Sequence, residues 1–161
     1  GGAESRYFHT EIGWNFKMPD PSAVLGISQL KKLPGIIEKK QKMALNYTKL
    51  FQEKLQDKII IPGIGKNRNH TVNLFSIRFE DENTRNLVKD YLDKKKIETR
   101  ICFPPIHLQP VYQKLYGFKS NTFPISELAA RTTLCMPMII GLSEKIQQDI
   151  VNYVSEAIRE T

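Results

Sequence analysis

In the N-terminal part of the chain, apolar positions recur among polar ones with the period of an α-helix. From 22 to 55, leucine or isoleucine recurs at intervals of about three or four, with lysine and glutamate between, which is the spacing of one apolar helical face. A proline inside a helix removes a hydrogen bond and clashes with the preceding turn. Because Pro34 is followed by Gly35, we expect a kink or break here, with two nearly continuous helices over about 22–33 and 36–56.

The middle of the chain changes to the pattern of short strands and short helices. Residues 70–79 alternate and are partly β-branched or aromatic, and a second segment, 97–103, ends at two prolines. Both segments are predicted to be strands. The other expected elements are an apolar stretch at 59–61, a helix capped by Asn83, a helix over 108–117 closed by Gly117, a helix over 126–131, a strand over 132–136 and a last helix capped by Ser143.

This order of elements predicts an α+β domain. We expect a small, mostly antiparallel sheet with helices on one face, preceded by a long helix. The chain has 161 residues, of which 40% are hydrophobic and 25% charged, enough for one domain, or for a small domain with a piece of another. No apolar run approaches the ~18 residues of a membrane span, and the N-terminus lacks the pattern of a signal peptide.

The two cysteines bear on the redox environment of the protein, and its net charge bears on the kind of partner it binds. Cys102 and Cys135 each lie among apolar neighbours, so we expect two core thiols in a reducing cytoplasm. The net charge of +7 includes lysine runs at 31–32, 39–40 and 94–96, and such runs are typical of solvated helix faces. A nucleic-acid partner is therefore not expected. A basic balance also suits a small anionic substrate, because it raises the local concentration of phosphates.

The residues contain no self-contained active site. His9, His70 and His107 lack metal-ligand spacing, so no metal is expected. The segment 63–66 lacks the full spacing of a phosphate loop and predicts a plain turn. His107 follows a stiff Pro-Pro pair at the end of an expected strand. A surface or core histidine is the favoured interpretation of His107 on these grounds, and a functional histidine is the alternative.

Five short motifs occur in order between residues 9 and 158. They are Gly13-Trp14-Asn15-Phe16-Lys17-Met18-Pro19-Asp20 with the following Ala23-Val24-Leu25-Gly26-Ile27-Ser28-Gln29-Leu30; Ile97-Glu98-Thr99-Arg100 with Phe103-Pro104-Pro105-Ile106-His107-Leu108-Gln109-Pro110-Val111-Tyr112; Phe123-Pro124-Ile125-Ser126-Glu127; Leu134-Cys135-Met136-Pro137-Met138; and Leu142-Ser143-Glu144. Each is weak alone. Together they resemble the DegT/DnrJ/StrS family of sugar aminotransferases.

The resemblance implies the C-terminal portion of a type I pyridoxal-phosphate (PLP) aminotransferase fold. Residues 1–35 would then end the large domain, with an active-site loop and a linking helix, and 36–161 would form the small domain. The family's Schiff-base lysine, and the aspartate that faces the pyridine nitrogen, lie upstream of the matched loop. The resemblance therefore assigns no catalytic residue to this chain.

The resemblance does imply binding roles. Asn15 is the candidate for the cofactor phosphate, reached across a dimer, because a charged acceptor strengthens such a hydrogen bond. Lys17 stands where the family usually has arginine, and it offers a point charge instead of a planar fork. The expected substrate-side residues are Trp14, Lys17 and His107, with Arg100 and Tyr112 as weaker candidates.

The implied activity is transfer of an amino group from glutamate to a nucleotide-linked keto-sugar through PLP, in amino-sugar or polysaccharide biosynthesis. We expect a cytoplasmic homodimer without a nucleic-acid or membrane partner, and no turnover by this chain alone. One alternative is a non-catalytic binding or regulatory module derived from such an enzyme. A second is a basic nucleic-acid-binding domain, for which binding would fall steeply with salt.

Overall fold

The computed structural model describes residues 14, 16–63, 65 and 67–159. The chain divides into two compact units, Gly1–Pro34 and Gly35–Thr161, which are described separately below. The assignment of 1–35 to the end of a large domain and of 36–161 to a small domain stays a prediction. None of the described helices is long and apolar enough to span a lipid bilayer.

A single helix, α1 (Asp20–Leu55), replaces the two that were predicted, and Pro34 lies inside it. The prediction of two helices was wrong because proline removes only one backbone donor, while most residues of 23–33 and 36–55 are good helix formers. The buried residues of α1 are Met43, Ala44, Tyr47, Phe51 and Leu55. All of them lie in the part of α1 that belongs to the second unit.

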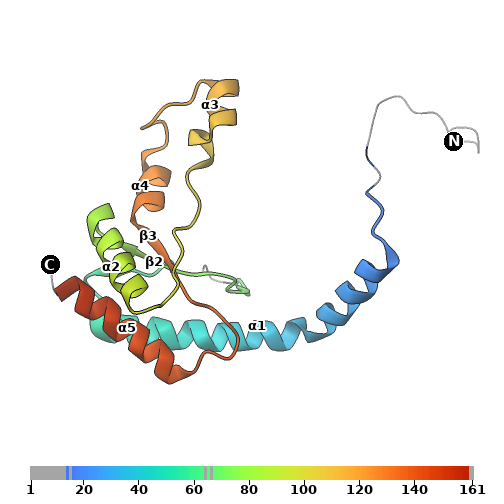
Figure 1. Ribbon diagram of the computed structural model, residues 1–161, viewed down its shortest axis with the longest axis horizontal. Coiled ribbons are helices and arrows are strands. Elements are labelled where there is room, and N and C mark those ends of the chain that lie inside the picture. The colour runs from blue at the N-terminus through green and yellow to red at the C-terminus, as the bar shows by residue number, and fades with distance from the viewer. Residues whose placement is uncertain (1–13, 15, 64, 66, 160–161) are drawn as a thin grey trace, which may run out of the picture. The chain divides into compact units, whose positions relative to one another are not determined.

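The second unit is built on a small antiparallel sheet. Its strands β1 (Ile59–Ile60), β2 (Phe75–Phe79) and β3 (Thr133–Met136) lie in the order β1-β2-β3. Phe79 pairs with Ile59 on one side, and Phe75 pairs with Met136 on the other. Figure 1 shows β2 and β3 near the centre of this unit, above α1 and α5 in that view. The predicted small, mostly antiparallel sheet is confirmed.

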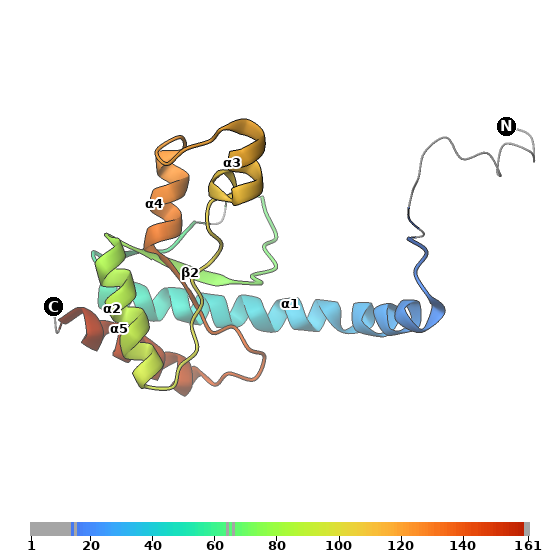
Figure 2. The ribbon, with the colours of Figure 1, turned by 45° about the horizontal axis from the view of Figure 1, so that its top comes forward.

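The hydrophobic core covers one face of the sheet. Phe75, Ile77 and Phe79 are buried and share that face, because side chains alternate along a strand. Against them pack the second part of α1 and the helices α2 (Glu82–Lys94) and α5 (Glu144–Arg159), and α2 and α5 also contact each other (Figure 2). The long helix and the helices on one face are thus as the sequence predicted.

Two predicted strands are shorter in the structure. Residues 70–74 are irregular, and the backbone N–H of Val72 donates to His70 Nδ1 at 3.0 Å. A backbone donor held by a side chain cannot join a strand ladder. The expected strand over 97–103 is reduced to one isolated bridge, between Arg100 and Cys135. The two prolines that follow this segment also restrict its pairing.

The expectation of two core thiols was wrong, because Cys102 and Cys135 form a disulfide in the structure. Cys135 lies on β3, and an isolated bridge pairs it with Arg100. Arg100 stands two residues before Cys102 in the chain. This pairing brings the two Cα atoms to 6.5 Å, within the range that a disulfide spans. A sequence separation of 33 residues does not reveal such a pairing.

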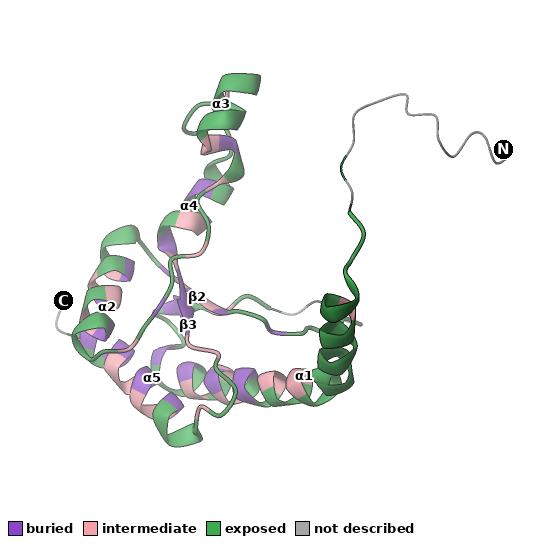
Figure 3. Ribbon diagram, turned by 45° about the vertical axis from the view of Figure 1, so that its right-hand side comes forward, coloured by how far each residue is buried: buried purple, intermediate pink, exposed green. Residues whose placement is uncertain are grey.

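The remaining helices lie beyond one end of the sheet. They are the 3₁₀ helix η2 (Ile106–Leu108), α3 (Pro110–Tyr116) and α4 (Pro124–Thr132). Gly117 ends α3, as predicted, and its φ of 69° is the left-handed conformation that glycine adopts readily at a helix end. No residue of α3 is buried, and Figure 3 shows this helix almost entirely in the colour of exposed residues.

Candidate functional site

The candidate site is built on the segment that carries His107. The extended backbone of Pro105 leads into η2, and His107 is the buried residue of that short helix, with 7% of its surface exposed. Its Nε2 lies 2.9 Å from Glu127 Oε1. The ring also meets Phe123 edge to face, with the ring centres 4.8 Å apart. His107 is therefore oriented by contacts on two sides.

Glu127 is the centre of this arrangement, and only 1% of its surface is exposed. Its Oε2 accepts from the Asn121 N–H at 3.0 Å and from the Ser120 hydroxyl at 3.3 Å, and its Oε1 accepts from the Phe123 N–H at 3.3 Å. The hydrogen bond from the Asn121 backbone lowers the pKa of Glu127 to about 2. Burial opposes this shift, while His107, Phe123 and Ser120 add to it.

An ionised carboxylate can only accept hydrogen bonds, so the His107 Nε2 that faces it carries a proton. The bond to Glu127 fixes the ring, and Nδ1 is the nitrogen that remains to meet a ligand. Carboxylates that hold a histidine in this way are common in sites that bind ligands or transfer protons. The geometry suits a histidine that binds and orients a polar group.

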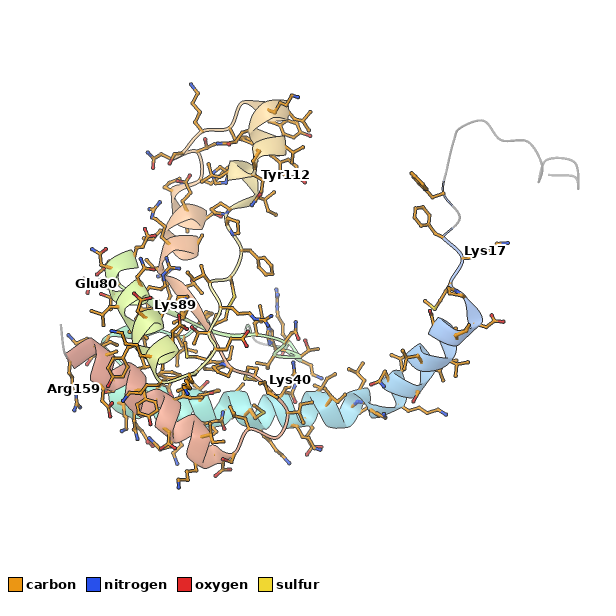
Figure 4. All side chains as sticks on the ribbon, in the orientation of Figure 1. Lys17, Lys40, Glu80, Lys89, Tyr112 and Arg159 are labelled. Atoms are coloured by element: carbon orange, nitrogen blue, oxygen red, sulfur yellow. A yellow bond between two sulfur atoms is a disulfide. The ribbon has the colours of Figure 1, made fainter. Side chains whose placement is uncertain are left out.

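Tyr112 lies on the same segment. It stands on α3, with 39% of its surface exposed, and it stacks on Tyr116 with the ring centres 6.3 Å apart (Figure 4). Tyr116 contacts Phe118 at 5.7 Å, and Phe118 contacts Phe123 at 5.7 Å. An aromatic row thus connects Tyr112 to the ring that packs on His107. The two predicted site residues are thus linked through this row of rings and not by a direct ring contact among those described.

Arg100 belongs to the sheet edge instead. Its side chain is 75% exposed, and its Nη2 lies 3.2 Å from Glu98 Oε1. Exposed ion pairs of this kind contribute little to stability. The environment is that of an exposed residue beside a strand, and a substrate role for Arg100 stays a prediction.

The other predicted site residues precede α1. Trp14 is 85% exposed, and Lys17, labelled in Figure 4, is exposed as well. Asn15, the predicted contact to the cofactor phosphate, lies outside the described residues. The binding roles of all three stay predictions.

The environment of the described lysines bears on covalent attachment of PLP. Such a cofactor needs a lysine amine, and a desolvated amine is the reactive form. In the part of the chain that the structure describes, no lysine side chain is buried. The same residues contain no group of three or more histidine, cysteine, aspartate or glutamate side chains that could hold a metal ion.

Glu127 is the site residue that sequence reasoning missed. It ends the Phe-Pro-x-x-Glu motif, but nothing in that motif names its partner. His107 lies 20 residues earlier in the chain, and only the folding of α4 back toward η2 brings the two side chains together.

Solved structures place this fold among the aminotransferases. The structure of DesV from S. venezuelae in complex with a ketimine intermediate superposes with a TM-score of 0.83, at 22% identity, over 97% of this chain and 41% of that chain. A DegT DnrJ EryC1 StrS aminotransferase from Brucella abortus superposes with a TM-score of 0.77, at 26% identity, over 93% of this chain and 38% of that chain. The fold is thus that of part of an aminotransferase, consistent with a C-terminal small domain.

The chain belongs to the DegT/DnrJ/EryC1/StrS aminotransferase family, whose family model matches residues 1–155. A pleiotropic regulatory protein of Geobacillus stearothermophilus is 30% identical over 98% of this chain and 42% of that protein. The GDP-perosamine synthase of Escherichia coli O157:H7 is 29% identical over 96% of this chain and 39% of that protein. The chain therefore spans about two fifths of the length of these relatives.

Proposed function

We propose that this chain is the C-terminal part of a nucleotide-sugar aminotransferase that transfers an amino group from glutamate to a keto-sugar. The observation that carries the proposal is the family match over 1–155, in a chain that spans only about two fifths of its relatives. Among those relatives are a GDP-perosamine synthase and a dTDP-4-amino-4,6-dideoxy-D-glucose transaminase.

Exposed apolar surface supports the view that further polypeptide completes the enzyme. Val24, Leu25 and Leu30 of α1 are 67%, 62% and 64% exposed. In the other unit, Ile125 of α4 and Leu115 of α3 are 80% and 65% exposed. Apolar surface of this extent usually marks an interface. Polypeptide that corresponds to the rest of the relatives' length, which this chain does not span, is the occupant that we propose.

In this proposal the segment from η2 to α4 forms part of the substrate wall. His107, held by Glu127, binds a polar group of the substrate through Nδ1. Tyr112 and its aromatic neighbours give the wall an apolar face, which excludes water and accepts the flat side of a ring.

The family implies PLP as the cofactor, which supplies an electron sink when it is bound. We propose that the lysine that attaches it lies in polypeptide outside this chain, so that the chain alone does not turn over. A cytoplasmic homodimer, with Asn15 reaching the neighbouring cofactor phosphate, completes the proposal.

The test is an absorbance scan of the full-length parent protein with PLP, from ~330 to ~430 nm, before and after glutamate is added. We expect a long-wavelength band that moves to short wavelength with glutamate. A folded parent protein without such a band would contradict the proposal. In parallel, the 161-residue chain is incubated with PLP, glutamate and a nucleotide-linked keto-sugar. Formation of amino sugar would contradict the expected lack of turnover.

The second candidate is a non-catalytic regulatory module. It is favoured by one observation, the name of the 30% identical relative from Geobacillus stearothermophilus. The absorbance scan separates the two candidates, because a regulatory module that has lost the chemistry would show no shift with glutamate.

A further inference from the structure

A cavity lies between α1 and the irregular segment before β2, apart from the site around His107. Its volume is about 650 Å³, within the range of pockets for small molecules. The residues that line it include Gln41, Ala44, Arg68, His70, Val72 and Phe75.

The outer wall of the cavity is tied to α1 by side-chain hydrogen bonds. Gln41 Nε2 donates to Asn69 Oδ1 at 2.6 Å and to the His70 carbonyl at 2.9 Å. Lys40, labelled in Figure 4, donates to Asn73 Oδ1 at 3.2 Å. Both ends of the segment 69–73 are therefore held in place, although it belongs to no strand.

The backbone of this wall is strained. Val72 is buried and has φ of 48°, a left-handed conformation that is rare for a β-branched residue. Strain of this kind persists only where its surroundings impose it, and it is concentrated at functional sites. Here it lets the Val72 N–H reach His70 Nδ1 at 3.0 Å. Because Nδ1 accepts this bond, the neutral ring carries its proton on Nε2, the nitrogen that remains to donate.

Among the residues that the structure describes, the lining is rich in donors and contains no aspartate or glutamate. Besides His70, it includes the Arg68 guanidinium and the Thr71 hydroxyl. A Cβ on Gly65 would lie 3.3 Å from Arg68 Nε, so the glycine gives the guanidinium room to lie against the backbone. Arginine beside neutral donors is the usual arrangement for phosphate oxygens. Ala44 and Phe75 add apolar surface for the rest of a ligand.

We infer that this cavity binds a small molecule that carries a phosphate group, at a site separate from the proposed aminotransferase site. Arg68 and His70 contact the phosphate, while Gln41 and Val72 hold the wall in position. The inference does not depend on aminotransferase activity, so it can fail or succeed independently of the proposed function.

The test is a titration of the ¹⁵N-labelled 161-residue chain, followed by amide chemical shifts at constant ionic strength. The probes are inorganic phosphate, ribose 5-phosphate and uridine 5′-monophosphate, with potassium chloride as the control. We expect saturable shifts confined to 41–48 and 61–76. Stronger binding of the two organic phosphates would show that the apolar surface is used, and equal binding of all three would indicate free phosphate as the ligand.

Three variants sharpen the result. Arg68→Met is expected to weaken binding about tenfold or more, because it removes a charge-assisted hydrogen bond. His70→Asn keeps an acceptor near the position of Nδ1 and removes the Nε2 donor, so binding should weaken several-fold while the Val72 amide shift is retained. Arg159→Met removes the same charge from an exposed position on α5, away from the lining residues, and should leave binding unchanged.

Two results would overturn the inference. One is the absence of saturable shifts with all three probes. The other is equal weakening by Arg68→Met and Arg159→Met, which would show attraction to the net charge of the chain and not to a site.

Discussion

At the scale of single residues, Glu127 accepts more hydrogen bonds than any other described residue of the candidate site. One carboxylate holds the turn at 120–123 through two backbone donors and a hydroxyl, and it holds η2 through His107. Since the hydrogen bonds favour the ionised form, the stability that Glu127 contributes depends on pH.

The pKa of Glu127 is lowered from 4.5 to about 2 in the folded chain, so its contribution is complete above pH 4.5 and is lost as pH falls toward 2. Glu127→Gln should lower the melting temperature at pH 7 and flatten the decline of stability between these two pH values. Thermal melts at several pH values measure this. Glu80→Gln, at an exposed position, is the control and should melt like the parent. Parallel pH profiles for Glu127→Gln and the parent chain would contradict the prediction.

Tyr47 gives a prediction of the opposite sign. Its ring stacks on Phe75 and Phe51 in the core, but the described residues offer its hydroxyl no hydrogen-bond partner. Burial raises the pKa of Tyr47 above its usual range. Tyr47→Phe keeps the ring and removes the unsatisfied group, so the free energy of unfolding should rise by about 1 kcal/mol. Urea denaturation checks this.

The same variant has a second expected effect. Because the folded pKa of Tyr47 lies above the unfolded value of 10.0, the parent chain should lose stability as pH rises above 10, and Tyr47→Phe should lose less. A clear loss of stability at pH 7 would instead mean that the hydroxyl has a favourable partner.

At the scale of elements, one of the two predicted N-terminal helix caps is confirmed and the other is wrong. Ser143 stands before α5 as predicted, and its Oγ accepts from the Ile146 N–H at 3.3 Å. The prediction that Asn83 caps α2 was wrong. Asp81 is the cap, and its Oδ1 accepts from the Thr84 N–H at 2.8 Å. Both residue types are good caps, so two candidates two positions apart cannot be separated by propensity alone.

This difference is testable. Asp81→Ala should lower the free energy of unfolding by about 1 kcal/mol, because it leaves a backbone donor of the first turn without its acceptor. Asn83→Ala, inside the same helix, should change it by no more than about 0.5 kcal/mol. Urea denaturation of both variants measures the contrast. A larger loss with Asn83→Ala would mean that the helix begins where the sequence pattern placed it.

At the scale of the whole chain, the core and the exposed apolar surface lie in different segments. Every residue of the described core cluster lies between Ala44 and Ala157. The residues of 20–34 are nearly all exposed, including several large apolar side chains. The stability of the second unit should therefore not depend on the first.

A chain comprising 35–161 tests this separation. Because no described core residue is removed, its melting temperature should match that of the 161-residue chain. Its near-ultraviolet circular dichroism, apart from the lost signal of Trp14, should also be retained. A large drop in melting temperature would show that the first unit contributes to the core. Self-association that disappears on truncation would identify the exposed face of α1 as the surface that associates.

The sequence by itself determined most of the element types, the α+β class and the family. Two kinds of pattern are local signals: helical periodicity over 22–55 and 144–159, and alternation at Phe75, Ile77 and Phe79. Each can be recognised from neighbouring positions in the sequence, whatever residues pack against it in the fold. The motif order likewise needs no structure. The continuity of α1 across Pro34 was not predicted, because the proline is a local signal. Its cost of one backbone hydrogen bond is small beside the stabilisation of the whole helix.

Only the tertiary structure decided which distant side chains meet. The pairing of Arg100 with Cys135 places Cys102 beside Cys135, and the return of α4 toward η2 places Glu127 beside His107. The cavity behind Val72 depends on hydrogen bonds between α1 and residues about 30 positions later. These contacts join residues that share no local period. They are set by packing and strand register, which the order of residues along the chain does not display.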